Sequence, residues 1–325
     1  MLEISLSGQD SSKTGTFKLT PAFFIKYALY FALLIMILFL SVSTDTFLTS
    51  SNIINVLRQI SIQAIMAVGM TMVIILGQID LSVGAIVAFA SVVNALFIKA
   101  GFPVLIAILM TLFISSLWGL ISGAITAKFN LHAFLVTLAM LTLIRGITYT
   151  LTGGYPIGGL PNSFYAFGAG YLWRIPYPVL YMIIIYLLGM FILRNTPFGR
   201  SIYSVGGNTE AARLSGIHIF RTKVVVFVTS AFLSGLGGII LSSRLRAGSP
   251  EVGLGWELDI VAAVIIGGTN LFGGEGKLTG TLIGMLFIGI LTNGMILLDV
   301  TPYMQQVARG LVILAAVVLN SLQEK

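Results

Sequence analysis

The strongest constraint on this chain is a succession of apolar runs, each close to the length that crosses a lipid bilayer. A helix needs about 20 apolar residues to span roughly 30 Å of hydrocarbon. Runs of this kind predict ten spans, at residues 22–43, 59–77, 82–99, 103–127, 133–151, 177–194, 223–243, 258–272, 278–297 and 303–320. Only helices and closed barrels satisfy their backbone groups in lipid. The sequence therefore predicts an all-α integral membrane protein.

The composition supports a single domain that is solvated by lipid. Hydrophobic residues make up 57% of the 325 residues and charged residues only 9%, whereas soluble domains carry about 25% charged residues. We expect a short cytoplasmic tail at residues 1–21 and one transmembrane domain at residues 22–325. The chain has no cysteine, and its two histidines, His132 and His218, lie far apart, which predicts no metal site and no cofactor.

The distribution of lysine and arginine predicts the orientation in the membrane. The net charge of +7 comes from basic residues scattered over short loops, not from the basic stripe typical of a nucleic-acid-binding surface. We therefore expect no nucleic-acid partner. With the N-terminus in the cytoplasm, most basic residues fall on the cytoplasmic side, as the positive-inside rule requires. Both termini are then inside, residues 195–223 form the largest cytoplasmic segment, and residues 152–176 and 244–257 lie outside.

Glycine-rich sequence predicts how the spans pack and where they break. Helices in lipid associate through small residues, and Gly119 with Gly123 and Gly280 with Gly284 form such pairs. Polar, glycine-rich stretches interrupt the apolar pattern at LGQIDLSVG and GGTNLFGGEGK. Each stretch stands between an apolar helix and a small-residue helix, which suggests an internal duplication with broken or re-entrant segments.

The stretch LGQIDLSVG places an acidic residue, Asp80, between two apolar runs. A charge at the bilayer centre is costly, so we expect Asp80 in a gap between helices, where Asp80 and Ser82 cap the helix that begins near Val83. The alternative is that this gap lines the translocation path. The polar side chains available to such a path are Gln78, Asp80, Ser82, Asn94, Asn270 and Asn293. Hydrogen bonds between helices explain these residues equally well.

The sequence offers neither an energy source nor a catalytic site. The partial match to a phosphate-binding loop, GGEGKLTG, has Leu278 after the lysine instead of serine or threonine. A secondary carrier needs ionisable groups within the membrane, and Asp80, Asp259 and Asp299 lie near predicted span ends. The chain carries neither a nucleophile with a neighbouring base nor an HExxH motif. We therefore expect a membrane protein that is not an enzyme and does not bind ATP through such a loop, with a secondary carrier as the less favoured alternative.

Three segments, in this order and spacing, resemble the membrane permease of ATP-binding-cassette sugar importers of the ribose-transporter type. They are AVGMTMVIILGQIDLSVGAIVAF, FGRSIYSVGGNTEAARLSGI and IVAAVIIGGTNLFGGEGKLTGTLIG. The resemblance runs from about residue 55 to the C-terminus. It implies a permease of the inner (cytoplasmic) membrane that works with a second permease copy or homologue, cytoplasmic ATPase subunits and an extracytoplasmic sugar-binding protein. The alternative within this superfamily is a branched-chain amino-acid permease.

The second of these segments carries a candidate coupling site. NTEAARLSGI predicts a short helix with Thr209 as the N-cap, Glu210 in the first turn, where the helix dipole favours an acid, and Gly216 as the end. The EAA sequence followed by this glycine resembles the coupling motif of importer permeases, although the Leu-Pro that follows in some relatives is missing. The resemblance implies docking on the ATPase through Arg200, Thr209, Glu210, Ala211, Ala212, Arg213 and Gly216. The alternative is a solvated loop.

Two arginines at the predicted outer surface, Arg244 and Arg246, form a candidate docking site for the sugar-binding protein. Exposed charges of this kind can pair with carboxylates on a partner and steer its approach. The alternative is that they are ordinary interfacial anchors at the end of a span.

Overall fold

The protein is a bundle of helices with two very small sheets, which confirms the predicted all-α class. The computed structural model describes residues 21–323, so the predicted tail at residues 1–21 lies outside the described part except for its last residue. Thirteen helices occur in this range: α1 Pro21–Ser43, α2 Ser50–Ile75, α3 Val83–Lys99, α4 Val104–Phe129, α5 Ala133–Thr152, α6 Asn162–Ala169, α7 Tyr177–Asn195, α8 Pro197–Gly207, α9 Thr209–Leu214, α10 Ile219–Leu245, α11 Trp256–Ile266, α12 Leu278–Leu297 and α13 Pro302–Gln323. Two antiparallel pairs of short strands complete the fold, β1 (Ile157–Gly158) with β4 (Ala247–Gly248) and β2 (Tyr171–Leu172) with β3 (Ile175–Pro176).

Each predicted span overlaps a helix, but the number of long apolar helices differs from the expected ten. Among the residues whose side chains the structure describes, six helices are long and apolar enough to cross a membrane: α2, α4, α5, α7, α10 and α12. α11 has 11 residues and is about 16 Å long, roughly half the hydrocarbon thickness, because its helix ends at Gly267. α9 matches the predicted short helix, whereas α6 and α8 were not predicted.

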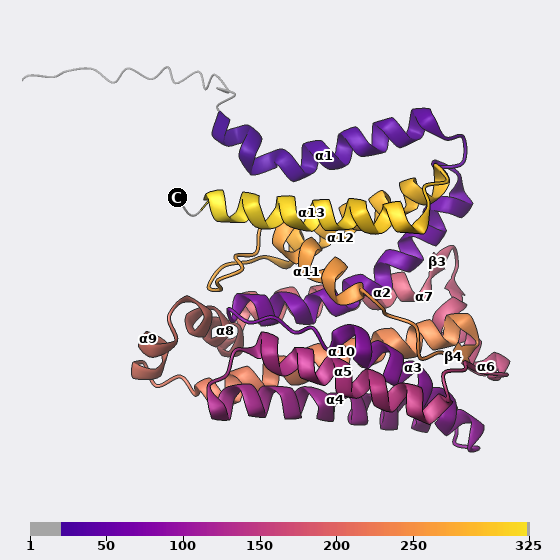
Figure 1. The fold of residues 1–325 in the computed structure, drawn as a ribbon, viewed down its shortest axis with the longest axis horizontal. Helices are drawn as coiled ribbons and strands as arrows, with labels where there is room; N and C mark the ends of the chain where they lie inside the picture. The colour runs from indigo at the N-terminus through magenta and orange to yellow at the C-terminus, as the bar shows by residue number, and fades with distance from the viewer. Residues whose placement is uncertain (1–20, 324–325) are drawn as a thin grey trace, which may run out of the picture.

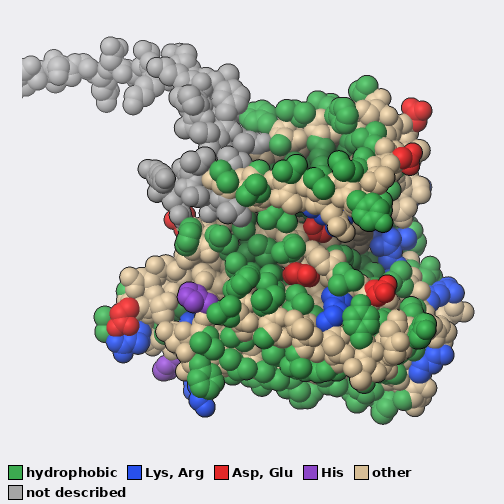
Figure 2. Space-filling model, viewed as in Figure 1, with side chains coloured by type: hydrophobic (Ala, Val, Ile, Leu, Met, Phe, Trp, Pro, Cys, Tyr) green, Lys and Arg blue, Asp and Glu red, His purple; other side chains and the backbone are tan. Residues whose placement is uncertain are grey.

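The helices run side by side, so the bundle has two ends (Figure 1). The end at the left of Figure 1 holds α8, α9 and the C-terminal end of α13. The opposite end holds α6 and both strand pairs, which come from the two predicted outer segments. Figure 2 shows hydrophobic side chains over most of the body between the ends, and acidic and basic side chains in a hollow at its middle. The apolar body is what contact with lipid requires.

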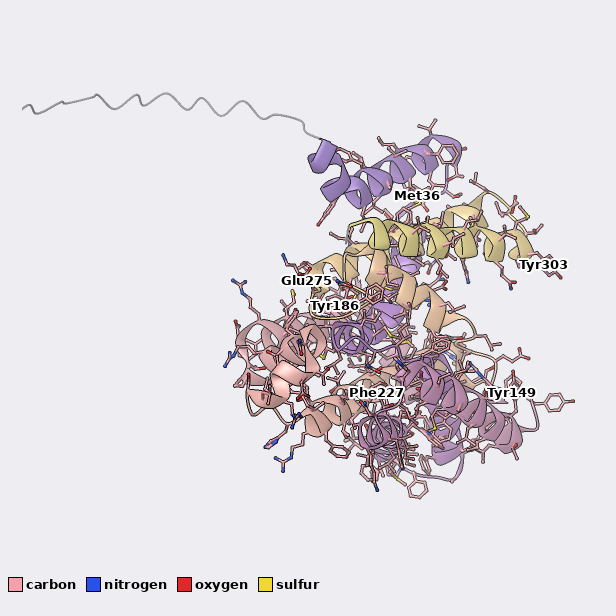
Figure 3. All side chains as sticks on the ribbon, turned by 60° about the vertical axis from the view of Figure 1, so that its left-hand side comes forward. Met36, Tyr149, Tyr186, Phe227, Glu275 and Tyr303 are labelled. Atoms are coloured by element: carbon pink, nitrogen blue, oxygen red, sulfur yellow. The ribbon has the colours of Figure 1, made fainter. Side chains whose placement is uncertain are left out.

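Two helices, α2 and α10, form the centre of the bundle. In their most apolar stretches, 89% of α2 and 72% of α10 is buried inside the protein. α10 packs against α2, α3 and α4, while α1 and α13 lie at the periphery. Figure 3 shows Phe227 of α10 and Tyr186 of α7 within the bundle and Tyr303 of α13 at its edge.

Small residues bring neighbouring helices into close contact, as predicted. Gly119 and Gly123 of α4 lie against α10, where a Cβ built on Gly123 would come within 2.9 Å of the Cα of Val224. Gly280 and Gly284 of α12 lie against α11 and its C-terminal end, because a Cβ at Gly284 would overlap the carbonyl of Ala263 and one at Gly280 would overlap the carbonyl of Gly267. Both predicted glycine pairs are therefore sites of helix packing.

Candidate translocation and coupling site

The two glycine-rich breaks lie against each other. The first break, residues 77–82, joins α2 to α3, and the second break, residues 267–277, joins α11 to α12. The N–H of Gly274 donates a hydrogen bond of 2.8 Å to the carbonyl of Ile75, the last residue of α2. A Cβ built on Gly77 would lie 2.9 Å from the carbonyl oxygen of Phe272. Two segments that are far apart in the sequence therefore form one backbone junction.

The two breaks also share a backbone pattern. In each, a glycine with positive φ follows the helix, Gly77 at 70° and Gly268 at 85°, a conformation that glycine adopts without a Cβ clash. Its N–H bonds the carbonyl three residues back, and the next N–H bonds the carbonyl five residues back. Further along, Asp80 and Asn270 each accept a hydrogen bond from the N–H two residues later. This likeness agrees with the predicted internal duplication, which stays a prediction.

Asp80 connects the start of α3 to α10. Its side chain is only 1% exposed. Its Oδ1 accepts hydrogen bonds from the N–H and the hydroxyl of Ser82, at 3.0 and 2.5 Å, and its Oδ2 accepts one from the hydroxyl of Ser230 at 3.0 Å. The prediction that Asp80 lies in a gap between helices is confirmed. The prediction that the Ser82 side chain caps α3 is wrong, because its hydroxyl donates to Asp80 and makes no cap bond.

The first break is also connected to α5. The Oε1 of Gln78 accepts a hydrogen bond of 3.0 Å from the N–H of Ala133, the first residue of α5. One turn further, the hydroxyl of Thr137 accepts a hydrogen bond of 3.1 Å from the N–H of Leu81. Because α5 and α10 both bond to the first break, a displacement of the break must move or release both helices.

α8 rests on the junction of the two breaks. A Cβ built on Gly206 would overlap the carbonyl oxygen of Ile75 and would lie 2.8 Å from the backbone nitrogen of Gly274. The hydroxyl of Tyr203 donates a hydrogen bond of 2.8 Å to the carbonyl of Gly276 in the second break. The segment predicted to be cytoplasmic therefore touches the end of α2 and the second break.

α9 begins one residue earlier than expected. The Oδ1 of Asn208 accepts a hydrogen bond of 2.9 Å from the N–H of Ala211, so Asn208 is the N-cap. The prediction of Thr209 as the N-cap is wrong, because its hydroxyl donates to the carbonyl of Val205 at the end of α8. The predicted end of the helix is confirmed, since Gly216 follows it with a φ of 81°.

The two alanines of α9 have opposite environments. Ala212 is 3% exposed and belongs to the hydrophobic core, so the structure does not support a contact with a partner at this position. Ala211 is exposed. Beside it, Leu214 is 76% exposed, an apolar residue that the sequence analysis did not consider although it stands within a polar segment. Ala211 and Leu214 are thus exposed apolar groups of α9.

Charged residues surround this apolar surface. Glu210 and Arg213 form an exposed ion pair, with 3.0 Å between Oε2 and Nε. The hydrogen bonds from Arg213 lower the pKa of the Glu210 carboxyl, so the pair stays charged at neutral pH. Arg200 of α8 is also exposed.

The candidate path residues lie in two kinds of environment. Gln78, Asp80 and Ser82 lie in the first break and Asn270 in the second. Asn94 of α3 is buried and donates to the hydroxyl of Thr111 in α4 at 3.4 Å. Asn293 of α12 exchanges two hydrogen bonds with Asn52 of α2, at 3.0 and 2.9 Å. Asn94 and Asn293 therefore connect helices, which was the alternative explanation of their polarity.

Four ionisable side chains inside the bundle have partners that the sequence analysis did not predict. Arg145 of α5 donates two hydrogen bonds of 2.9 Å to carbonyls of the loop before α11 and interacts electrostatically with Glu257. Asp259 of α11 forms an ion pair of 3.5 Å with Arg309 of α13. The signal was present in the sequence, because Arg145 and Arg309 both fall inside predicted spans, where charges are rare and often functional.

The opposite end of the bundle carries basic and aromatic side chains around β2 and β3. The guanidinium of Arg246 lies 3.9 Å from the ring centre of Tyr165, and that of Arg58 lies 4.5 Å from the ring centre of Tyr171. Arg244 is half-buried and close enough to Arg58 for their charges to interact. We call this the basic–aromatic surface, formed by Arg58, Tyr165, Tyr171, Trp173, Arg244 and Arg246.

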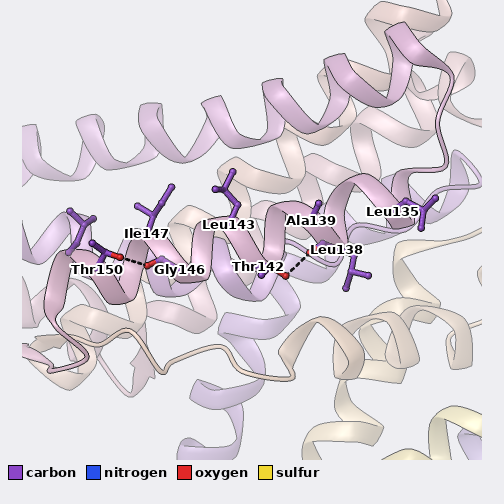
Figure 4. Close-up of a pocket in the computed structure, with 9 residues that line it drawn as sticks. Leu135, Leu138, Ala139, Thr142, Leu143, Gly146, Ile147 and Thr150 are labelled. Atoms are coloured by element: carbon purple, nitrogen blue, oxygen red, sulfur yellow. Dashed lines mark hydrogen bonds between the residues drawn. The ribbon is translucent and has the colours of Figure 1, made fainter.

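An apolar groove follows the outer face of α5 (Figure 4). The hydroxyls of Thr142 and Thr150 in this groove donate to the carbonyls of Leu138 and Gly146, at 3.2 and 2.9 Å. Because the hydroxyls are satisfied within the helix, the groove needs no water. Its lining residues are Leu135, Leu138, Ala139, Thr142, Leu143, Gly146, Ile147, Thr150 and Leu151.

Broken helices that meet in the body of a membrane bundle, with a short exposed helix resting on their junction, are the architecture of a membrane permease component. The chain belongs to the family described as the permease component of the branched-chain amino acid transport system, which matches residues 52–317.

Several curated proteins are similar to the chain over most of its length. The ribose import permease protein RbsC of Haemophilus influenzae is 44% identical, over 95% of this chain and 97% of that protein. The ribose import permease protein RbsC of Bacillus subtilis is 43% identical, over 90% of this chain and 91% of that protein. The xylose transport system permease protein XylH of Haemophilus influenzae is 33% identical, over 95% of this chain and 99% of that protein. No solved structure matches the chain.

Proposed function

We propose that the chain is the transmembrane permease subunit of an ATP-driven importer for a pentose sugar, with ribose as the main substrate. The observation that carries this proposal is the 44% identity to a ribose import permease over nearly the whole length of both proteins. A more distant relative is named for xylose, so pentoses recur among the relatives. Because the sequence has no complete phosphate-binding loop, ATP hydrolysis belongs to separate cytoplasmic subunits, and this chain supplies the path.

The contacts of α8 and α9 support a role in coupling. Ala211 and Leu214 of α9 are exposed for docking on an ATPase subunit, and Gly206 of α8 touches the carbonyl of Ile75 where both breaks meet. A displacement of α9 by the ATPase therefore reaches the broken helices through one short helix. The coupling end of the bundle then faces the cytoplasm, together with the C-terminal end of α13.

The opposite end of the bundle then faces the outside, where a sugar-binding protein docks. Arginine and aromatic side chains are enriched in protein interfaces, and the basic–aromatic surface supplies both kinds. Charges at such a surface raise the rate of association more than the final affinity. Glutamate at both Arg244 and Arg246 should therefore raise the binding-protein concentration needed for half-maximal uptake, whereas simple anchoring arginines would not change it.

A second permease copy placed against the α5 groove would complete the path. Helix association in lipid relies on small residues and close packing, and the groove offers Ala139, Gly146 and satisfied threonines. The charged groups of α5, α11 and α13 need a polar environment, which a water-filled path between two copies provides. The family model describes amino-acid permeases, so a branched-chain amino acid is the alternative substrate.

Uptake measurements separate the two substrates. Cells that lack their own ribose importer are given the permease together with its ATPase and binding protein, and the uptake of labelled ribose and labelled leucine is measured. We expect ATP-dependent uptake of ribose that unlabelled xylose reduces, and no uptake of leucine above that of cells without the permease. Leucine uptake without ribose uptake would show that the proposed substrate is wrong.

A further inference from the structure

A small polar pocket lies beside α9, at the coupling end of the bundle. Its volume is about 370 Å³, near the lower end of the range of roughly 300–1,000 Å³ for small-molecule sites. Four parts of the chain contribute polar side chains to it. These parts are the first break, the turn between α4 and α5, α9, and α10. Their polar side chains on the lining are Gln78, Asn130, His132, Thr209, Glu210 and Lys223.

Lys223 is the side chain of this pocket that most needs a partner. It is 6% exposed, yet the two ion pairs formed within residues 21–323, Glu210 with Arg213 and Asp259 with Arg309, do not include it. Most of the residue is buried, but its ammonium group is accessible at the pocket, where it needs hydrogen-bond acceptors. Because Lys223 lines an open pocket, a ligand that enters the pocket can supply the missing acceptors.

The charges of the pocket indicate what kind of ligand fits. Glu210 and Lys223 carry opposite charges on the same lining, and Arg213, the ion-pair partner of Glu210, is not part of that lining. An anion that reaches Lys223 therefore still meets the carboxylate, and a cation meets the ammonium. A neutral solute with several hydroxyl groups can accept from Lys223 and donate to Glu210 at once. Gln78 keeps its amide nitrogen as a further donor, because its oxygen already accepts from Ala133.

We propose that this pocket binds a neutral polyhydroxylated solute from the cytoplasmic side, with the imported sugar as the physiological ligand, and that its occupation slows import. This inference rests on the proposed function for the identity of the ligand. Because the pocket joins α9 to α10 and to the turn before α5, a bound sugar would hold α9 in place. The movement that couples ATP hydrolysis to the breaks then becomes harder, so that accumulated product restrains its own import.

A binding experiment tests the pocket without the rest of the importer. The full-length permease in lipid nanodiscs, without the binding protein, is titrated with ribose, xylose and ribose 5-phosphate by equilibrium dialysis with labelled ligands. We expect ribose and xylose to bind and ribose 5-phosphate to bind more weakly. Lys223→Met should weaken ribose binding by about tenfold or more, since it removes a charged donor. Asn130→Gly is a second variant, because glycine keeps the left-handed conformation found at this position.

A transport experiment tests the consequence. The complete importer is reconstituted in vesicles that contain no sugar or millimolar ribose on the cytoplasmic side, and the initial rate of ribose uptake is compared. Internal ribose should reduce the rate for the original chain by about fivefold or more, but by less than about twofold for Lys223→Met. Lys128→Met, an exposed neighbour outside the pocket, is the matched control and should remain inhibited.

The outcomes distinguish this inference from the proposed function. Normal ribose uptake, with no binding of either sugar to the permease alone, would overturn the pocket and leave the proposed function intact. Tighter binding of ribose 5-phosphate than of ribose would contradict the charge argument. Equal binding in the original chain, Lys223→Met and Asn130→Gly would show that the sugar binds elsewhere. If the importer carries no sugar at all, the nanodisc titration still decides whether the pocket accepts neutral polyols.

Discussion

Gly206 of α8 lies against the carbonyl oxygen of Ile75 at the end of α2, with no space for a side chain between them. The same carbonyl accepts a hydrogen bond from the N–H of Gly274 in the second break. One oxygen atom is therefore shared by α8, the first broken helix and the second break. A force on α8 reaches both breaks directly, without another element to absorb it.

Alanine at Gly206 should weaken this contact. Its Cβ would overlap a backbone oxygen, which cannot move aside as a side chain can, and overpacking of this kind costs about 1–3 kcal/mol. We expect Gly206→Ala to lower the melting temperature of the purified permease and to reduce sugar uptake. Gly207→Ala is the matched control, because its nearest neighbour would be 3.9 Å away. Equal stability and uptake in the two variants would contradict the contact.

Asparagine and leucine at Asp80 should have different effects. Asp80→Asn retains an oxygen that accepts the Ser82 N–H, so it should keep most of the protein in the membrane. Asp80→Leu leaves buried donors of Ser82 and Ser230 without an acceptor, which should destabilise the fold by at least about 2 kcal/mol. Thermal unfolding in detergent measures this difference. If Asp80→Asn has normal stability but no uptake, the negative charge of Asp80 is needed for transport along the translocation path and not for folding.

Tryptophan at Ala211 should separate ATP hydrolysis from transport. The position is exposed, so the large side chain disturbs no packing within the permease but blocks close approach of an ATPase subunit. We expect normal amounts of permease in the membrane, loss of the ATPase on co-purification and loss of uptake. Ala212→Trp should instead reduce the amount of folded permease, because Ala212 is buried. If Ala211→Trp retains both the ATPase and full transport, the docking surface lies elsewhere.

Cysteine labelling tests the orientation. The chain has no cysteine of its own, and Ser163 and Ser204 are exposed at opposite ends of the bundle. With the coupling end in the cytoplasm, a membrane-impermeant thiol reagent should label Ser163→Cys in intact cells and Ser204→Cys only after the membrane is opened. The reverse pattern would mean that the orientation inferred from the basic residues is inverted.

Cross-linking tests the position of the second copy. Leu143 in the α5 groove is 51% exposed and Phe191 on α7 is 58% exposed. If two copies meet along α5, Leu143→Cys should form a disulfide-linked dimer under mild oxidation, while Phe191→Cys, which faces lipid, should not. Dimers from Phe191→Cys alone would move the interface to α7.

Apolar periodicity and glycine spacing predicted most of the helical architecture. The runs located every long helix, because lipid allows few other structures, and the spacing of Gly280 and Gly284 predicted a close helix contact. The number of complete spans was not predictable in this way. Hydropathy alone cannot show that α11 ends at Gly267, since its residues are as apolar as those of a full span.

The candidate site was predicted in part, because local sequence does not report three-dimensional neighbours. The gap around Asp80 was predicted, but its bond to Ser230 joins residues 150 positions apart. Asn208 and Thr209 are both good N-cap residues. Asn208 is the N-cap in the structure because the hydroxyl of Thr209 donates to the carbonyl of Val205 in α8 instead. The burial of Ala212 depends on how α9 lies against the core, which the pattern of a six-residue helix does not show.

The central position of α2 has a consequence for how the protein is made. The chain emerges from the ribosome in order, so α2 reaches the membrane long before α10, which packs against it. It also precedes Asn293, which exchanges hydrogen bonds with Asn52 across 241 positions. Until then, Asn52 lacks its partner Asn293, and α2 lacks its packing against α10. The second helix of this protein must therefore wait at the insertion machinery or in a provisional arrangement, and membrane assembly is completed only when the last third of the chain has been synthesised.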